Sequence, residues 1–169
     1  MTVTVDLVTP AGIMPAVAEA TLEPNTPLRI ELGGVAGPTY GARVSATGPI
    51  AAAVRAEGES GFAVMPGVAT PARTWLLPGL RSAGLEEATL WMINTGEDAV
   101  TATVSVLTGG GLVGETVTVD AGTIYEFGPV AEGGLGYLVE SAPSPISVAW
   151  SITSPGGTAF ASGIPVTDG

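Results

Sequence analysis

The chain has 169 residues and a net charge of −11, because 16 acidic side chains face five Arg and no Lys. This charge repels phosphate backbones and anionic lipid headgroups, so we expect no nucleic-acid partner and no direct membrane binding. Cys and His are also absent, which removes disulfides, thiolate and imidazole metal sites, and Ser-His-Asp or Cys-His catalysis. Carboxylates are the one type of side chain left that could act in catalysis. We expect no catalytic residue, no metal and no cofactor.

The composition and the first segments predict an all-β fold. Apolar residues make up 46% of the chain, aromatic residues only 5%, and Gly and Pro are frequent, which is typical of many short strands joined by tight turns. Residues 2–14 alternate apolar and polar side chains, as a strand does. Residues 15–23 have helix propensity, but their counterpart at 114–121 is β-branched and alternating. Both segments are therefore predicted to be strands.

The sequence repeats itself in four blocks that recur in the same order. Within the blocks apolar residues alternate with polar ones, and Gly, Pro and Asn fall at the strand junctions, where turns require them. The matching blocks are 2–14 with 101–113, 22–33 with 119–128, 40–54 with 135–150, and 59–68 with 155–166. This repeat predicts two equivalent cores. Their expected residues are Val5, Leu7, Leu28, Ile30, Val44 and Val54 in the first copy and Val104, Val106, Tyr125, Phe127, Val139 and Trp150 in the second.

The segment between the copies, 70–100, predicts strands at 73–77 and 88–94 that have no counterpart in the first copy. The sequence thus predicts two tandem β-sandwich repeats of immunoglobulin-like type, with residues 1–68 forming a first repeat that lacks its N-terminal strands and 69–169 a second. The missing strands would leave an open sheet edge. We expect the linking strands to be shared between the copies, in preference to a strand added by a second molecule, and hence a monomer.

Three tryptophans, Trp75, Trp91 and Trp150, are candidates for stacking on sugar rings, because a flat apolar ring suits a pyranose face as well as a protein core. Trp150 shares its strand face with Val148, which favours a core position. Trp91 lies in an unbroken apolar run, and Trp75 follows Arg73 in a connecting strand. For these two a core position is favoured, but a binding role stays open. Trp75, Trp91 and Arg73 are accordingly the candidate ligand-binding residues.

Two further motifs have structural interpretations. Gly109, Gly111 and Gly114 match GxGxxG, but the following residues continue as a strand and open no helix, so we interpret them as a hairpin turn and not as a nucleotide site. The acid pairs at 86–87 and 97–98 are interpreted as solvated turn residues. A weak Ca²⁺ site and a pair of glycosidase carboxylates are the alternatives.

The second copy contains, in order, the segments WLLPG, ATLWMINTG, ATVSVLTGGG, VDAGTIYEFG, ISVAW and FASGIPV. This order resembles a family of actinobacterial large secreted proteins of unknown function, which are envelope-associated chains of repeated β units. The resemblance implies a secreted or cell-envelope location and supplies no catalytic residues. The N-terminal MTVTVDLV lacks the basic start and apolar core of a signal peptide, so we expect either a cytosolic protein or a piece of a secreted one.

Together these observations predict a non-enzymatic β-sandwich module of a secreted or cell-envelope protein. It would act as a scaffold, a spacer or a protein-binding domain, with a protein or a cell-wall polysaccharide as its partner. The alternatives are a carbohydrate-binding module that uses an exposed Trp and a glycosidase that depends on Glu97 or Asp98.

Overall fold

A computed structural model describes residues 1–32, 39–58, 61–78, 87–128, 136–154 and 157–166. Within these ranges the chain forms antiparallel strands and no helix, so the all-β prediction is confirmed and no described segment offers an apolar helix of membrane-spanning length. The strands are β1 (Thr2–Thr9), β2 (Gly12–Thr21), β3 (Gly41–Ala46), β4 (Ala53–Gly58), β5 (Gly61–Pro66), β6 (Thr74–Pro78), β7 (Glu87–Ile93), β8 (Val100–Thr108), β9 (Gly111–Val119), β10 (Ile124–Phe127), β11 (Gly136–Ala142), β12 (Ser147–Ser154), β13 (Gly157–Ser162) and β14 (Ile164–Pro165).

We call residues 1–68 the first unit and residues 69–169 the second unit. The second unit is a sandwich of a five-stranded sheet, in the order β14-β6-β11-β8-β9, and a four-stranded sheet, in the order β10-β7-β12-β13. Its core contains residues from both sheets, because alternate side chains of each strand point inward. The buried residues are Trp75, Leu77, Ala88, Leu90, Met92, Val100, Ala102, Val104, Val119, Tyr137, Val139, Ile146, Val148 and Trp150.

The first unit repeats part of this arrangement, with corresponding cross-strand partners except at a bulge in β2. Its three-stranded sheet, β2-β1-β3, corresponds to β9-β8-β11 of the second unit. Val5 faces Val44 across β1 and β3, just as Val104 faces Val139 across β8 and β11. The hairpin of β4 and β5 corresponds to that of β12 and β13. The pairing of the repeated blocks is therefore confirmed at the level of individual cross-strand partners.

Turn geometry also repeats between the units. The side-chain oxygen of Thr9 donates to the carbonyl oxygen of Gly12 across the first hairpin, at 2.8 Å, and Thr108 donates to Gly111 in the second, at 2.9 Å. Gly12 and Gly111 both have a positive φ, of 126° and 117°, which a glycine adopts without steric cost. Residues 109–110 thus form a hairpin turn and Gly111 and Gly114 lie in β9, in agreement with the predicted hairpin.

The expected sharing of the linking strands is wrong. Strand β6 pairs with β11 and β14, and strand β7 pairs with β10 and β12, so both complete the second sandwich. In the first unit, residues 27–32 correspond to β10 but form no strand, because the neighbour that would pair with them, a counterpart of β7, is missing.

The prediction of two equivalent cores is also wrong, because the first unit has too few strands to enclose one. Val5 and Leu7 are buried, whereas Leu28, Val44 and Val54 are exposed. In the second unit Val104, Val139 and Trp150 are buried, while Val106 and Phe127 are partly buried against the same core. Tyr125 is exposed, and its strand β10 is the edge strand of the four-stranded sheet.

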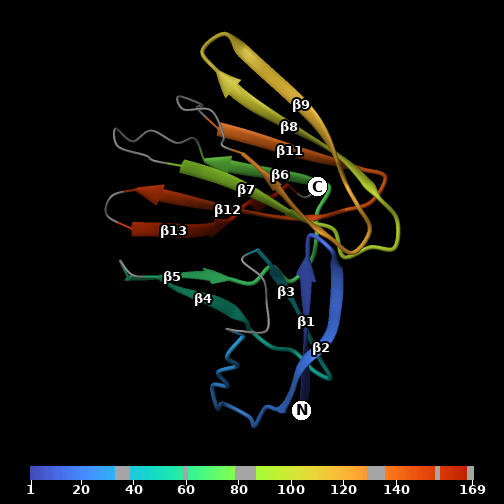
Figure 1. Cartoon of the computed structure of the whole chain (residues 1–169), viewed down its shortest axis with the longest axis vertical. Helices are drawn as coiled ribbons and strands as arrows, with labels where there is room; N and C mark the ends of the chain where they lie inside the picture. Colours follow the sequence, from blue (N-terminus) through green and yellow to red (C-terminus); the bar gives the residue numbers. More distant parts are fainter. Residues whose placement is uncertain (33–38, 59–60, 79–86, 129–135, 155–156, 167–169) are drawn as a thin grey trace.

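Figure 1 shows the two units one above the other along the long axis of the molecule, with the N terminus at the lower end and the β8–β9 hairpin at the upper end. Strand β5 lies alongside β13, although no ladder of backbone hydrogen bonds joins them in the described sheets. Strand β5 is therefore one place where the first unit lies against the second.

Candidate functional site at the junction of the two units

A row of three residues at the upper end of the first sheet forms one side of the junction. Ile13, Val8 and Gly41 are direct cross-strand partners on β2, β1 and β3. Partners in an antiparallel sheet project to the same face, so the three residues make one continuous apolar row. Val8 is fully buried although it lies on the opposite face of β1 from Leu7, which is also buried. Both faces of this end of the sheet are therefore covered.

The second unit contributes Ile93, Ile124 and Gly122 to the same junction. Ile93 and Ile124 are cross-strand partners at the ends of β7 and β10. A Cβ atom placed on Gly41 would lie 2.6 Å from Cδ1 of Ile93 and 3.8 Å from Cδ1 of Ile124. The glycine therefore leaves the space that these isoleucine side chains fill.

Gly122 makes a similarly close contact with the other end of the row. A Cβ atom on Gly122 would lie 3.2 Å from Cγ1 and 3.3 Å from Cδ1 of Ile13. Gly122 also has a φ of 66°, so both its backbone conformation and its neighbour favour glycine here. Ile124 is buried but does not belong to the core cluster of the second sandwich, which is expected of a residue buried by the neighbouring unit.

The buried side chain of Asn94 holds the turn that carries Gly122. Its amide nitrogen lies 3.1 Å from the carbonyl oxygen of Val119, 3.2 Å from that of Asp120 and 2.9 Å from that of Asp98. Its side-chain oxygen accepts a hydrogen bond from the backbone N–H of Gly96 at 2.9 Å. A buried amide with all its groups paired fixes the loops around it, so Asn94 is a positioning residue for the junction.

The first sheet has an irregularity next to the row, in β2. Leu7 pairs with Met14 and Val5 pairs with Ala18, so two steps along β1 span four steps along β2. Ala16, within this bulge, has a φ of 49°, an uncommon conformation for a residue with a side chain.

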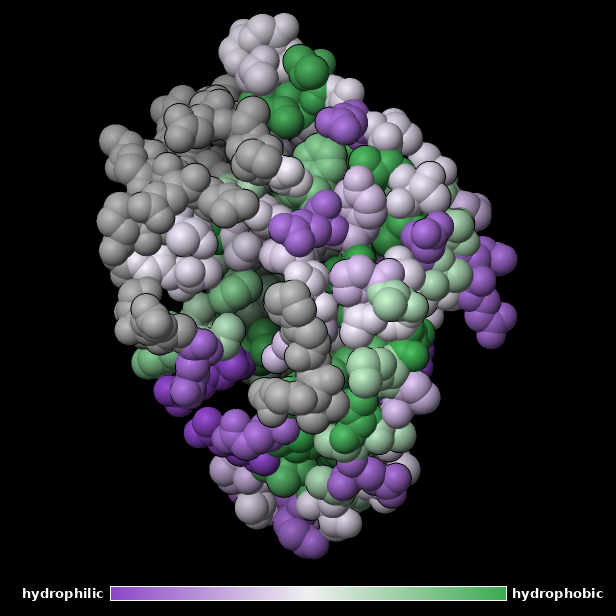
Figure 2. Space-filling model, in the orientation of Figure 1, coloured by the Kyte–Doolittle hydropathy of each residue, from purple (hydrophilic) through white to green (hydrophobic). Residues whose placement is uncertain are grey.

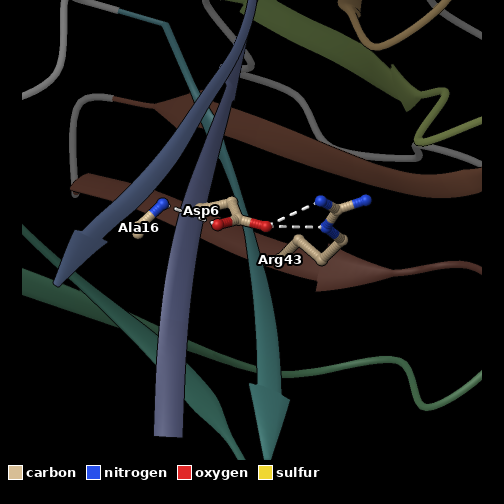
Figure 3. Close-up of polar contacts among 3 residues, drawn as sticks. All are labelled: Asp6, Ala16 and Arg43. Atoms are coloured by element: carbon tan, nitrogen blue, oxygen red, sulfur yellow. Dashed lines mark hydrogen bonds and ion pairs between the residues drawn. The ribbon is translucent and has the colours of Figure 1, made fainter. Parts of the chain in front are cut away.

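Asp6 stabilises this bulge and ties it to β3 (Figure 3). One carboxylate oxygen accepts the N–H of Ala16 at 2.8 Å, and the other accepts Nε and Nη2 of Arg43 at 2.9 and 2.7 Å. The bond from Ala16, together with Arg43, lowers the pKa of Asp6 despite its burial. Asp6 projects to the same face of β1 as Val8, so the cluster supports the end of the sheet that docks.

The candidate ligand-binding residues do not come together. Trp75 is fully buried between the two sheets, and its Nε1 donates to the carbonyl oxygens of Ala72, at 3.0 Å, and Ile146, at 2.9 Å. This burial favours the core interpretation, because no ring face is open to a sugar. Trp91 is half-buried on the outer face of the four-stranded sheet, and its Nε1 donates to Ser151 at 3.0 Å. Arg73 is exposed at the start of β6.

The remaining motifs form no cluster in the described structure. Glu97 and Asp98 are exposed in the loop after β7. Glu86 lies outside the described residues, and Glu87 begins β7. Among the described residues, no three His, Cys, Asp or Glu side chains are grouped so that they could hold a metal ion. Trp150 is buried in the core, as predicted, and its Nε1 has no hydrogen-bond partner among the described atoms.

Sequence reasoning did not identify the junction residues. One signal was available, since each copy places a glycine, Gly41 or Gly136, at the first residue of the corresponding strand. A glycine in a strand often marks the close approach of another chain segment. Asn94 had no such signal, because its role depends on carbonyl groups of residues that are distant in the sequence.

The fold and the junction define a class of protein, namely an all-β protein whose antiparallel units pack through an apolar joint. A family model described as a family of unknown function (DUF5719) matches residues 45–164, and the chain belongs to that family. No curated protein matches the chain significantly. One solved structure, "Crystal Structure of Thermotoga maritima 1070", is similar over 59% of this chain and 98% of its own, with 16% identity and a TM-score of 0.47.

Proposed function

We propose that the chain is a non-enzymatic scaffold or spacer module of a secreted or cell-envelope protein, in which successive β units are held at a fixed distance and angle. The junction carries this proposal. Ile93 and Ile124 of the second unit lie against Gly41 of the first, and Ile13 of the first lies against Gly122 of the second. Such an apolar joint resists hinge motion better than a polar linker does.

The surface charge supports the same role. A net charge of −11 keeps such modules soluble and apart from one another at high local density. A scaffold needs no reacting group, and the chain has neither His, Cys nor Lys to supply one. A protein-binding role would use the same fixed arrangement of units to present a surface.

The proposal is tested by measuring the distance between the units. The chain has no Cys, so spin labels can be attached at Glu23→Cys and Glu115→Cys, two exposed positions on different units. We expect a single narrow distance distribution, which broadens when Ile13→Asp places a charge in the joint. A broad distribution with the joint unaltered would contradict the proposal.

A titration separates the scaffold from a carbohydrate-binding module. All three tryptophans lie in the second unit, and a sugar stacked on Trp91 would perturb their fluorescence. A scaffold gives no saturable change with cell-wall polysaccharide. A saturable change that Trp91→Ala abolishes would favour the carbohydrate-binding alternative instead.

A further inference from the structure

The second unit contains a row that corresponds to the docking row of the first. Leu112, Leu107 and Gly136 are direct cross-strand partners on β9, β8 and β11. Each row lies immediately beside its hairpin turn. Leu107 therefore occupies the place of Val8, Leu112 that of Ile13, and Gly136 that of Gly41.

The two rows differ in what covers them. Val8 is fully buried and its row partners Gly41 and Ile13 lie against the second unit, whereas Leu107 is 43% exposed and Leu112 is 62% exposed. Large apolar side chains exposed together on one strand pair are unusual for a surface that meets only water.

The exposed row lies at the free end of the molecule. The β8–β9 hairpin is at the upper end of the long axis in Figure 1, opposite the first unit, and Figure 2 shows a small hydrophobic group just below the pale tip at that end. The row therefore stands where a further unit would continue the stack.

We infer that the row of Leu107, Leu112 and Gly136 is a docking surface for another β-sandwich unit of this same kind. The incoming unit would present an apolar pair such as Ile93 and Ile124, at the ends of its own β7 and β10. The inference rests on the proposed scaffold function and names the partner of that scaffold.

The occupant is a further unit and not a second folded copy of this chain. In a folded copy Ile124 is already buried, and Ile93 already fills the space beside Gly41. An isolated chain therefore has an exposed docking row, while the Ile93 and Ile124 pair that would match it is already in use. The chain alone is expected to be monomeric.

The test adds such a unit. Residues 69–169 are fused a second time after residue 169, and a single Cys replaces Leu112 in the original second unit. We expect the thiol at position 112 to react at least ~10-fold more slowly with a maleimide in the extended protein than in the chain itself, because docking removes it from water. Introducing Ile93→Asp and Ile124→Asp in the added unit should restore the rate.

Two controls define the comparison. A thiol at Glu23, which is exposed in the first unit, should react equally fast in both proteins, and a thiol at Ile13 should be protected in both. Equal reactivity at position 112 with and without a folded added unit, judged by circular dichroism, would overturn the inference.

A second measurement needs no added unit. In the chain itself, Leu112→Asp should leave the urea midpoint of unfolding unchanged, whereas Ile13→Asp should lower it. If both substitutions lower the midpoint equally, the exposed row supports its own unit and the inference fails. The spin-label distance measurement tests whether the two units of the chain are rigidly joined. Its outcome is therefore independent of the thiol-reactivity and urea-unfolding results, which test the docking row.

Discussion

Replacing Gly41 by Val tests whether the two units interlock as the structure shows. A Cβ atom at this position lies 2.6 Å from Cδ1 and 3.3 Å from Cγ1 of Ile93, and 3.8 Å from Cδ1 of Ile124. The two methyl groups of Val extend further into the same space. Overpacking of this kind costs about 1–3 kcal/mol, and Val has a high strand propensity, so the loss would come from the junction and not from β3 itself.

The assay is urea unfolding followed by circular dichroism, with a double-mutant cycle. Ile93→Ala removes Cγ1 and Cδ1, the atoms that the new side chain would meet. Gly41→Val should therefore destabilise the Ile93→Ala protein by less than about 0.5 kcal/mol, and the difference between the backgrounds measures the coupling. An equal loss in both backgrounds would refute the interlocking contact. The Ile93→Ala protein alone provides the baseline for the lost isoleucine side chain.

Two more predictions follow from buried polar groups. The pKa of Asp6 is lowered by its bonds to Ala16 and Arg43, so its contribution to stability is complete above the ordinary pKa and is lost as the pH falls through the lowered one. Asp6→Asn should reduce stability at pH 7 by about 1–2 kcal/mol and flatten the acid side of the stability curve, whereas an unchanged slope would contradict this assignment. For the buried tryptophans, Trp75→Phe should cost about 1 kcal/mol more than Trp150→Phe, because it removes two hydrogen bonds to carbonyl oxygens that keep only their backbone donors, while Trp150 has no partner to lose. Equal costs in urea unfolding would argue against these hydrogen bonds.

The strands and turns could be predicted because they depend on neighbours in the sequence. Alternation of apolar and polar residues located β1, β2, β8 and β9. Asn25 in the first unit and Gly122 in the second lie in matching turns, and both have a positive φ. Asn and Gly are residues that tolerate this conformation. Comparison of the copies also predicted that Val5 and Val44 are equivalent to Val104 and Val139, and the structure shows that each of these two sets forms a cross-strand pair.

Burial in the second sandwich was predictable for a related reason. Its strands have one face toward the partner sheet and one toward solvent, so parity along the strand decides which side chains are inside. Val104, Val139 and Trp150 follow this rule. The half-buried position of Trp91 did not follow from parity, because its segment is apolar on both faces.

The amino-acid sequence by itself determined the repeat, the all-β class, the turns and the chemistry that the chain lacks, since each of these depends on residue type and spacing along the chain. Only the tertiary structure decided which strands complete which sheet and which exposed faces become covered. Val8 and Leu107 occupy corresponding places in the two copies, yet one is fully buried and the other is 43% exposed. The difference arises because burial depends on whether another surface lies against the residue, and that surface is supplied by side chains such as Ile93 and Ile124, far away in the sequence.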